Sequence, residues 1–303
     1  MGKRQDHARR VGQLLDDLTT LRRLLLDGSG LPGPRGNLEL AAAFADAVGE
    51  RGPAGAPWPQ LFEWSALGPE QAPTNHPAVF LVFCALQALA ALYVDADPKQ
   101  RARIAAALDQ AAEDGRWRVR EAAAMGLQRI GERDVPIFLT LVERWAEAPS
   151  LRLERAALVA LAHPPLLGDA AVVEPALGWT DGVLRALELR ARPARSPQPE
   201  ADWPEDEARP ARPAARARRG AKSAALAPRS EDERVLLQAL QFAPSVLVAA
   251  APGPGFAMLR RWASSRSPLV QRIVVSNLGK ARLARRFPSE IEEIGEVLAA
   301  SVQ

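Results

Sequence analysis

Residue types that do catalytic or metal chemistry are sparse in this sequence. It has one Cys, Cys84, and three His, at positions 7, 76 and 163, which stand too far apart to act as a helical pair of metal ligands. It has no H-E-x-x-H zinc motif, no G-x-S-x-G nucleophile elbow and no G-x-x-x-x-G-K-S/T phosphate loop. We therefore predict no catalytic residue, no metal site and no cofactor.

One glycine-rich stretch, residues 28–33, fits the pattern G-x-G-x-x-G. That pattern binds a dinucleotide when it follows a strand and opens a helix. Here it follows an amphipathic helical segment and contains Pro32, so we predict a helix stop and a turn. Cys84 stands in the apolar stretch 79–89 and is predicted to be a small buried hydrophobe.

Two groups of cationic residues have the chemistry to bind a macromolecule. Arg116, Trp117 and Arg118 stand at a predicted helix start, where an indole between two cations could stack on a base or contact an acidic partner. Packing inside the protein is the competing interpretation of Trp117. The second group is the stretch 259–288, which has no acidic residue and eight basic ones: Arg260, Arg261, Arg266, Arg272, Lys280, Arg282, Arg285 and Arg286.

On adjoining helices the cations of 259–288 could form one basic surface that contacts phosphates. The alternative is a solvated face in a chain that is rich in Arg throughout. The formal net charge of the 303 residues is only +3. Ten basic and five acidic residues between positions 190 and 230 give that segment +5, so the remainder carries −2.

Helices are the elements that must position these residues, because apolar residues recur at steps of three and four and no stretch alternates with period two. Asp97-Pro98 and Ser267-Pro268 are typical helix starts, and Ser230…Glu233 and Ser289…Glu292 fit the capping box. We predict the helix pairs 98–114 with 117–131, 135–147 with 151–163, 254–265 with 268–284, and 169–190 with 231–250. A last helix, with Ile291, Ile294 and Leu298 on one side, is predicted to cap the end.

A repeat links these pairs. Three helices carry the same apolar stripe at four-residue steps, and the first two stripes lie 34 residues apart. The stripes are Val119-Ala123-Leu127, Leu153-Ala157-Leu161 and Val270-Val274-Leu278. Trp145 and Trp262 each precede a stripe by eight residues, which predicts the same packing role for both.

The window 113–131 resembles a HEAT repeat of the bacterial kind, and the wider similarity runs from about residue 77 to the end. Its most specific parts are 116–132, the dipeptide Arg144-Trp145 and the stretch 262–283. The resemblance implies an all-α, HEAT-like α-solenoid, an ARM-type superhelix of short antiparallel helix pairs. In such repeats an Asp–x5–Arg pair, here Asp114 and Arg120, forms a ladder between neighbouring repeats, although the other two copies lack it.

More distantly, the chain is similar to the HEAT-like DNA glycosylases of alkylation repair, which hold a damaged duplex in a concave, Arg- and Lys-rich surface. The Trp-Trp-Asp segment expected of that branch has no match in this sequence, so the resemblance implies no catalytic residue.

The expected organisation and function follow from these features. We expect a non-catalytic scaffold that binds a protein partner; the alternative is a nucleic-acid-binding protein that uses the Arg260–Arg286 surface.

No run approaches the roughly 18–20 uncharged apolar residues of a membrane span, and Asp16 and Asp17 break the first apolar segment. We therefore expect no signal peptide, no membrane contact and a cytoplasmic location. The predicted parts are N-terminal helices 1–50, an irregular Pro-rich connection 51–76, repeats 77–190, a disordered linker 191–230, and C-terminal repeats with a capping helix 231–303.

Overall fold

The computed structural model describes residues 3–191 and 230–301, so positions 192–229 of the predicted linker lie outside the described residues. All regular secondary structure in the described part is helical, which confirms the all-α fold class. The helices are α1 (Lys3–Leu14), α2 (Leu18–Asp27), α3 (Leu38–Gly55), α4 (Trp58–Ser65), α5 (Ala78–Leu92), α6 (Pro98–Ala112), α7 (Trp117–Gly131), α8 (Val135–Ala146), α9 (Leu151–Leu161), α10 (Ala170–Ala191), α11 (Glu231–Leu240), α12 (Ala243–Ala250), α13 (Pro252–Ala263), α14 (Pro268–Leu278), α15 (Ala281–Ala284) and α16 (Pro288–Ala300), with short 3-10 turns at Tyr93–Asp95 and Pro164–Leu166.

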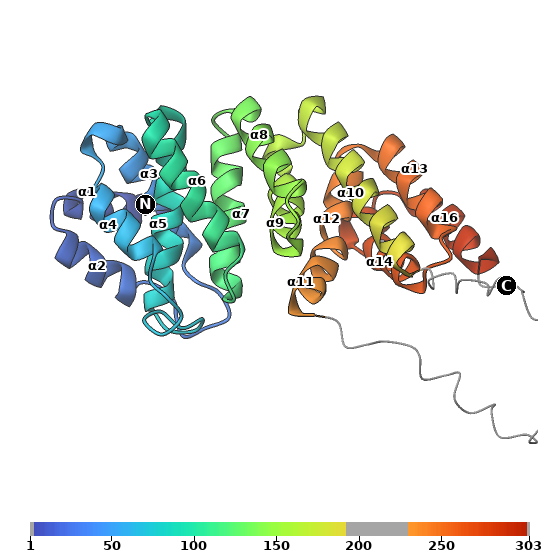
Figure 1. The fold of residues 1–303 in the computed structure, drawn as a ribbon, viewed down its shortest axis with the longest axis horizontal. Coiled ribbons are helices and arrows are strands. Elements are labelled where there is room, and N and C mark those ends of the chain that lie inside the picture. Colours follow the sequence, from blue (N-terminus) through green and yellow to red (C-terminus); the bar gives the residue numbers. More distant parts are fainter. Residues whose placement is uncertain (1–2, 192–229, 302–303) are drawn as a thin grey trace, which may run out of the picture.

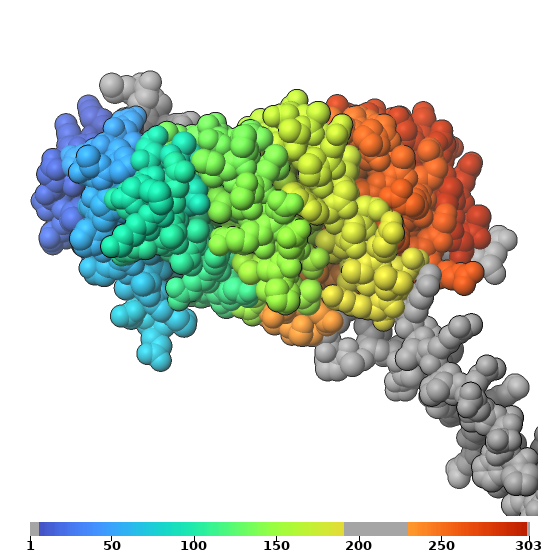
Figure 2. All heavy atoms as spheres, turned by 45° about the horizontal axis from the view of Figure 1, so that its top comes forward, coloured from blue at the N-terminus to red at the C-terminus, as the bar shows by residue number. Residues whose placement is uncertain are grey.

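The helices follow one another along a single long axis, from α1 and α2 at one end to α13 and α16 at the other (Figure 1). The space-filling view shows a similar progression on the surface from blue to red, except that an orange patch lies beneath the green and yellow helices (Figure 2). α5 packs against α3 and α7, α7 packs against α9, and α9 packs against α11, so these helices form one row. A second set packs against this row: α4 on α5, α6 on α7, α8 on both α7 and α9, and α10 on α9.

Three of the four predicted helix pairs pack as expected, because α6 packs on α7, α8 on α9, and α13 on α14. The predicted helix 268–284 is nevertheless too long, since α14 ends at Leu278 and Ala281–Ala284 forms the separate helix α15. The fourth prediction is wrong. Residues 231–250 form two helices, α11 and α12, because the chain breaks at Gln241 and Phe242. Pro244 then stands in the first turn of α12. α11 packs mainly against α9, whereas α12 packs against α10 and α13. The break therefore lets residues 231–250 pack against α9 with one helix and against α10 and α13 with the other.

Local chemistry explains most helix starts. Asp97 and Ser230 form capping boxes with Gln100 and Glu233, and the Ser267 hydroxyl accepts from Val270 N. The predicted box at Ser289 is wrong, because α16 begins at Pro288 and Ser289 lies inside its first turn. A proline tolerates that first position since it has no N–H to leave unpaired.

The Pro-rich connection 51–76 is more regular than expected. α3 runs on to Gly55 through a kink at Gly52, whose φ of 66° suits glycine, and α4 follows within the connection. The Trp58 indole donates to the carbonyl of Pro53 at 2.9 Å and its ring stacks on Phe62, while Trp64 is buried. Aromatic packing thus orders a segment that its prolines alone would leave irregular.

The centre of the core is α5, in which every residue is buried. The window Ala78–Asp95 has the length and hydropathy of a membrane span, which corrects the expectation that no run approaches one. In the structure 89% of that window is buried among other helices, as in the core helix of a bundle. Cys84 lies there fully buried, as predicted.

The other sequence predictions for the core are confirmed in part, because Leu153 of the middle stripe and Ile291 and Leu298 of the final helix are only partly buried. The stripe residues Val119, Ala123, Leu127, Val270 and Val274 are buried in the same way on their two helices. The stretch 28–33 ends α2 at Gly28 and turns at Gly30, whose φ of 73° is in the left-handed region. The final helix buries Ile294 against α13.

Candidate functional site

The predicted binding residues at the start of α7 differ in how far they are exposed. Arg116 and Arg118 are each only 6% exposed, whereas Trp117 between them is 46% exposed. The expectation that both arginines belong to an open basic surface is therefore wrong. Their neighbours explain the burial, since each guanidinium binds backbone carbonyls from loops that come earlier in the chain.

Arg118 holds two of these loops on α7. Its Nε donates to the carbonyl of Thr74 at 2.9 Å, and its Nη2 donates to the carbonyl of Gly33 at 2.6 Å. Its guanidinium carbon lies 4.2 Å from the centroid of the Trp117 ring, a cation–π distance. Burial lowers the pKa of Arg118 from its usual value, although the side chain stays a cation. Arg118 is therefore a structural residue that supports the Trp117 side chain.

The expected ladder between Asp114 and Arg120 also takes a different form. The Asp114 carboxylate accepts from Arg116 Nε at 2.9 Å and from Arg116 Nη2 at 2.6 Å. Arg120 donates instead to the backbone carbonyls of Asp114 and Gly115, each at 2.8 Å. The pair thus closes the turn before α7, and the pKa of Asp114 is lowered because its bonds to Arg116 outweigh the effect of burial.

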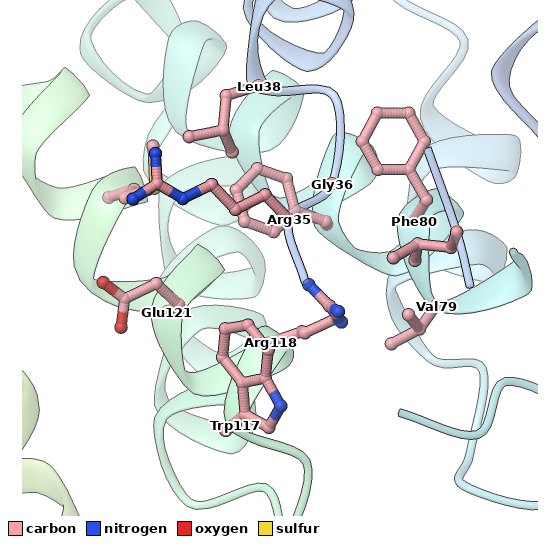
Figure 3. Close-up of a pocket in the computed structure, with 11 residues that line it drawn as sticks. Arg35, Gly36, Leu38, Val79, Phe80, Trp117, Arg118 and Glu121 are labelled. Atoms are coloured by element: carbon pink, nitrogen blue, oxygen red, sulfur yellow. The ribbon is translucent and has the colours of Figure 1, made fainter. Parts of the chain in front are cut away.

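An apolar hollow lies beside Trp117, on the face where the loop 31–37, α5 and α7 meet (Figure 3). Its volume is about 190 Å³, and its walls include Phe80 and Phe83 of α5 and Met125 of α7. Sites for drug-sized ligands usually have about 300–1,000 Å³. This hollow therefore fits one large side chain better than a whole cofactor.

Two exposed residues form part of the rim of this first hollow. Leu38 is 47% exposed, and Arg35 makes no hydrogen bond or ion pair with any described residue. In Figure 3 Arg35 extends over the open space towards the side on which Glu121 lies. The rim thus offers an apolar contact and a free cation next to each other.

A second hollow adjoins the first, because Trp117 and Glu121 line both. Its volume is about 360 Å³, and it extends across α9 to α11 and to Phe242, which lies between α11 and α12 and is 40% exposed. Arg120 and Arg155 also line it. We call the two hollows together the groove; they lie over α5, α7, α9 and α11 and share Trp117 and Glu121 as lining residues.

The charge of the second hollow is positive. Arg155 Nη2 pairs with Glu121 at 2.8 Å, but Arg155 Nη1 and Arg120 Nε are buried without a hydrogen-bond partner. The pKa of Arg120 is lowered, first by burial and then by the neighbouring cations Arg155 and Arg152. Two arginines and one carboxylate line this hollow, so its charge favours a ligand that brings an anionic oxygen.

The cations of the stretch 259–288 fall into two groups, those that form ion pairs and those that do not. Arg260 pairs with Glu293, and Arg261 pairs with Asp181. Within residues 3–191 and 230–301 the remaining cations of the stretch form no ion pair: Arg266, Arg272, Lys280, Arg282, Arg285 and Arg286. Arg282 lies 5.0 Å from the centroid of Phe242, and Arg286 lies 5.0 Å from that of Phe287.

The structure therefore brings the two predicted groups together at only one place. Phe242 lines the second hollow with Trp117, and Arg282 covers its ring. Sequence reasoning missed Arg35, Leu38, Arg155 and Phe242. A signal existed for one of them, since Glu121 and Arg155 are separated by 34 residues, the same spacing as the apolar stripes.

No group of three or more His, Cys, Asp and Glu side chains in the described ranges is arranged to hold a metal ion. His163 Nε2 instead lies 2.7 Å from Glu132 Oε1, and Cys84 is enclosed in the core. Among known proteins, no family model matches the chain, and no curated sequence matches it significantly. The function is therefore inferred from the geometry of the groove.

Proposed function

We propose that this chain is a HEAT-like α-solenoid that acts as a non-catalytic scaffold and binds a protein partner in the groove around Trp117. The two sets of packed helices, the stripes 34 residues apart and the row α5, α7, α9 and α11 support the fold assignment. Such folds present an extended surface built from one helix of each repeat, and the groove lies on one row of this kind.

The observation that carries the proposal is the position of Trp117. Its indole is half exposed although the Arg118 guanidinium packs against its ring, and it lines both hollows. Tryptophan and arginine are the residues that most often dominate protein–protein binding, usually at the centre of an interface and next to a pocket. A fixed, exposed tryptophan costs little further entropy on binding.

Selection of peptides against the immobilised full chain tests this proposal. We expect a random peptide library to yield binders whose affinity falls at least about tenfold with Trp117→Ala, as for an interface hot spot. Leu189→Ala is the control, because Leu189 is a similarly exposed apolar residue of α10 that lines neither hollow. Binders that tolerate Trp117→Ala would contradict the proposed site.

A nucleic-acid-binding role is the second candidate, and the unpaired cations near the end of the chain favour it. Anisotropy of a labelled DNA duplex at several salt concentrations tests it, since each phosphate contact contributes about one unit to the log–log salt slope. The variant with Arg282, Arg285 and Arg286 changed to Ala should reduce that slope. The matched control changes Arg9, Arg51 and Arg260 to Ala, because a carboxylate already pairs with each of these arginines. An unchanged slope, or no binding at low salt, would eliminate this role.

A further inference from the structure

The groove has an uneven distribution of charge and apolar surface that restricts what can occupy it. Four arginines line the two hollows, against the single carboxylate of Glu121. That carboxylate is already paired with Arg155. The first hollow is walled mainly by aromatic and aliphatic side chains, with Arg35 and Arg118 among them, whereas Arg120 and Arg155 line the second hollow.

We propose that the occupant is an acidic, apolar segment of a partner protein, with a large aromatic or aliphatic side chain in the first hollow and carboxylates at Arg35 and in the second hollow. This inference rests on the proposed protein-binding function and adds the chemistry of the partner.

The size of the first hollow is the reason for inferring a large apolar side chain in the partner segment. About 190 Å³ suits one large side chain, and Phe80 and Phe83 offer ring faces and edges to it. Leu38 lies exposed at the rim, so its apolar surface becomes covered only when something occupies the hollow. Burial of apolar surface is the main driving force for such anchors.

The arginines of the two hollows are the reason for inferring that the partner segment is acidic. Arg35 is exposed and has no partner within the described residues, so a carboxylate beside the anchor residue meets a guanidinium that needs no rearrangement. In the second hollow the cations Arg120 and Arg155 repel each other, and a carboxylate there removes that repulsion. A basic segment would face four arginines and gain nothing from Glu121, which is already paired.

Trp117 is common to the two hollows of the groove. Because Trp117 and Glu121 line both hollows, a segment that occupies both lies beside the indole. An extended peptide or one face of a helix can place an apolar side chain against that indole. A phosphodiester backbone carries a charge at every step and would place one of them on the indole.

A peptide array tests the proposal on the full-length chain. Each sequence has Trp or Leu as the anchor and flanking positions filled with Glu, Gln or Lys, and binding of the fluorescently labelled protein is measured. We expect the Glu series to bind about tenfold more tightly than the Gln series, and the Lys series to show no binding, as for charge-assisted hydrogen bonds. Equal binding of Glu and Gln peptides would overturn the acidic part, even if Trp117→Ala still abolished binding and upheld the groove.

Two charge variants locate the carboxylates. Arg35→Gln should remove the preference for Glu beside the anchor, with Arg266→Gln as the control that makes the same change in net charge at an exposed, unpaired arginine. Arg155→Gln should remove the preference at the far end. Arg129→Gln is its control, because Arg129 is similarly buried and paired with Asp46 but lines neither hollow. Controls that act like the variants would overturn the assigned positions.

Other occupants give distinct results. Displacement of a bound Glu peptide by an unlabelled DNA duplex, at a concentration near the duplex affinity, would show that nucleic acid takes the groove and would overturn the proposal. Dimerisation of the wild-type chain that Trp117→Ala abolishes, seen by light scattering, would assign the groove to a second copy and would also overturn it. Persistence of the peptide complex in both experiments is the expected result.

Discussion

Trp145 donates its indole N–H to Asp109 Oδ1 at 2.6 Å, across the gap between α8 and α6. Arg144, the residue before it, donates to the same oxygen at 2.6 Å. The same arrangement recurs in α13, where Trp262 donates to Asp181 Oδ1 at 2.6 Å and Arg261 pairs with the same carboxylate. Each of the two Arg-Trp dipeptides thus binds an aspartate of an earlier helix, which explains why a tryptophan stands eight residues before two of the apolar stripes.

Loss of either of these contacts should destabilise the fold. Trp145→Phe keeps the ring but removes the donor to Asp109, and we expect the free energy of unfolding to fall by about 1–3 kcal/mol. Trp262→Phe should have an effect of similar size, because Asp181 accepts in the same way. Urea unfolding followed by circular dichroism measures both. A change below about 0.5 kcal/mol in both variants would mean that the contacts do not contribute.

Arg118 should be more important for stability than for binding. Arg118→Ala removes the donors to the carbonyls of Gly33 and Thr74, so we expect a loss of about 3 kcal/mol and faster proteolysis near those loops. Arg118→Lys should restore little of this, because an ammonium lacks the planar fork that reaches both carbonyls. Arg266→Ala, at an exposed arginine, should change stability by less than about 0.5 kcal/mol. Wild-type stability in Arg118→Ala would contradict the structural role.

Glu154 should make stability depend on pH. Burial raises the pKa of this carboxyl above 4.5, and Arg190 only partly opposes the shift. The folded state then binds the proton more tightly than the unfolded state, so the charged form of Glu154 costs stability once the pH exceeds its folded pKa. Glu154→Gln should therefore be more stable than the wild type at neutral pH, with the advantage vanishing below about pH 4.5.

Thermal unfolding from pH 4 to pH 8 measures this difference. Glu143→Gln, at an exposed position of α8, serves as the control for a change in net charge. An advantage of Glu154→Gln that grew as the pH fell would have the wrong sign and would refute the assignment.

Cys84 should be unreactive in the folded protein. Burial raises the pKa of its thiol well above the usual value, and no part of the side chain is exposed. Because the thiolate is the reactive form, a maleimide should label Cys84 only as fast as the chain unfolds. Labelling of the native protein at the rate of a free thiol would show that α5 is open to solvent.

The sequence by itself determined the elements that depend on neighbours in the chain. Periodic apolar residues and caps such as Asp97 with Gln100 act within a few positions, so the helices and three of their pairs could be predicted. The burial of Cys84 followed from its apolar surroundings in the same way.

Only the tertiary structure decided what each cation does. Arg116, Arg118 and Arg120 are directed to backbone carbonyls, which every residue possesses and which no side-chain pattern can therefore reveal. The split of 231–250 into α11 and α12 likewise depends on which earlier helices offer an apolar face. Trp117 remains exposed for the same reason: its neighbours in space come from α9 and α11, and their packing leaves a groove beside it rather than filling it.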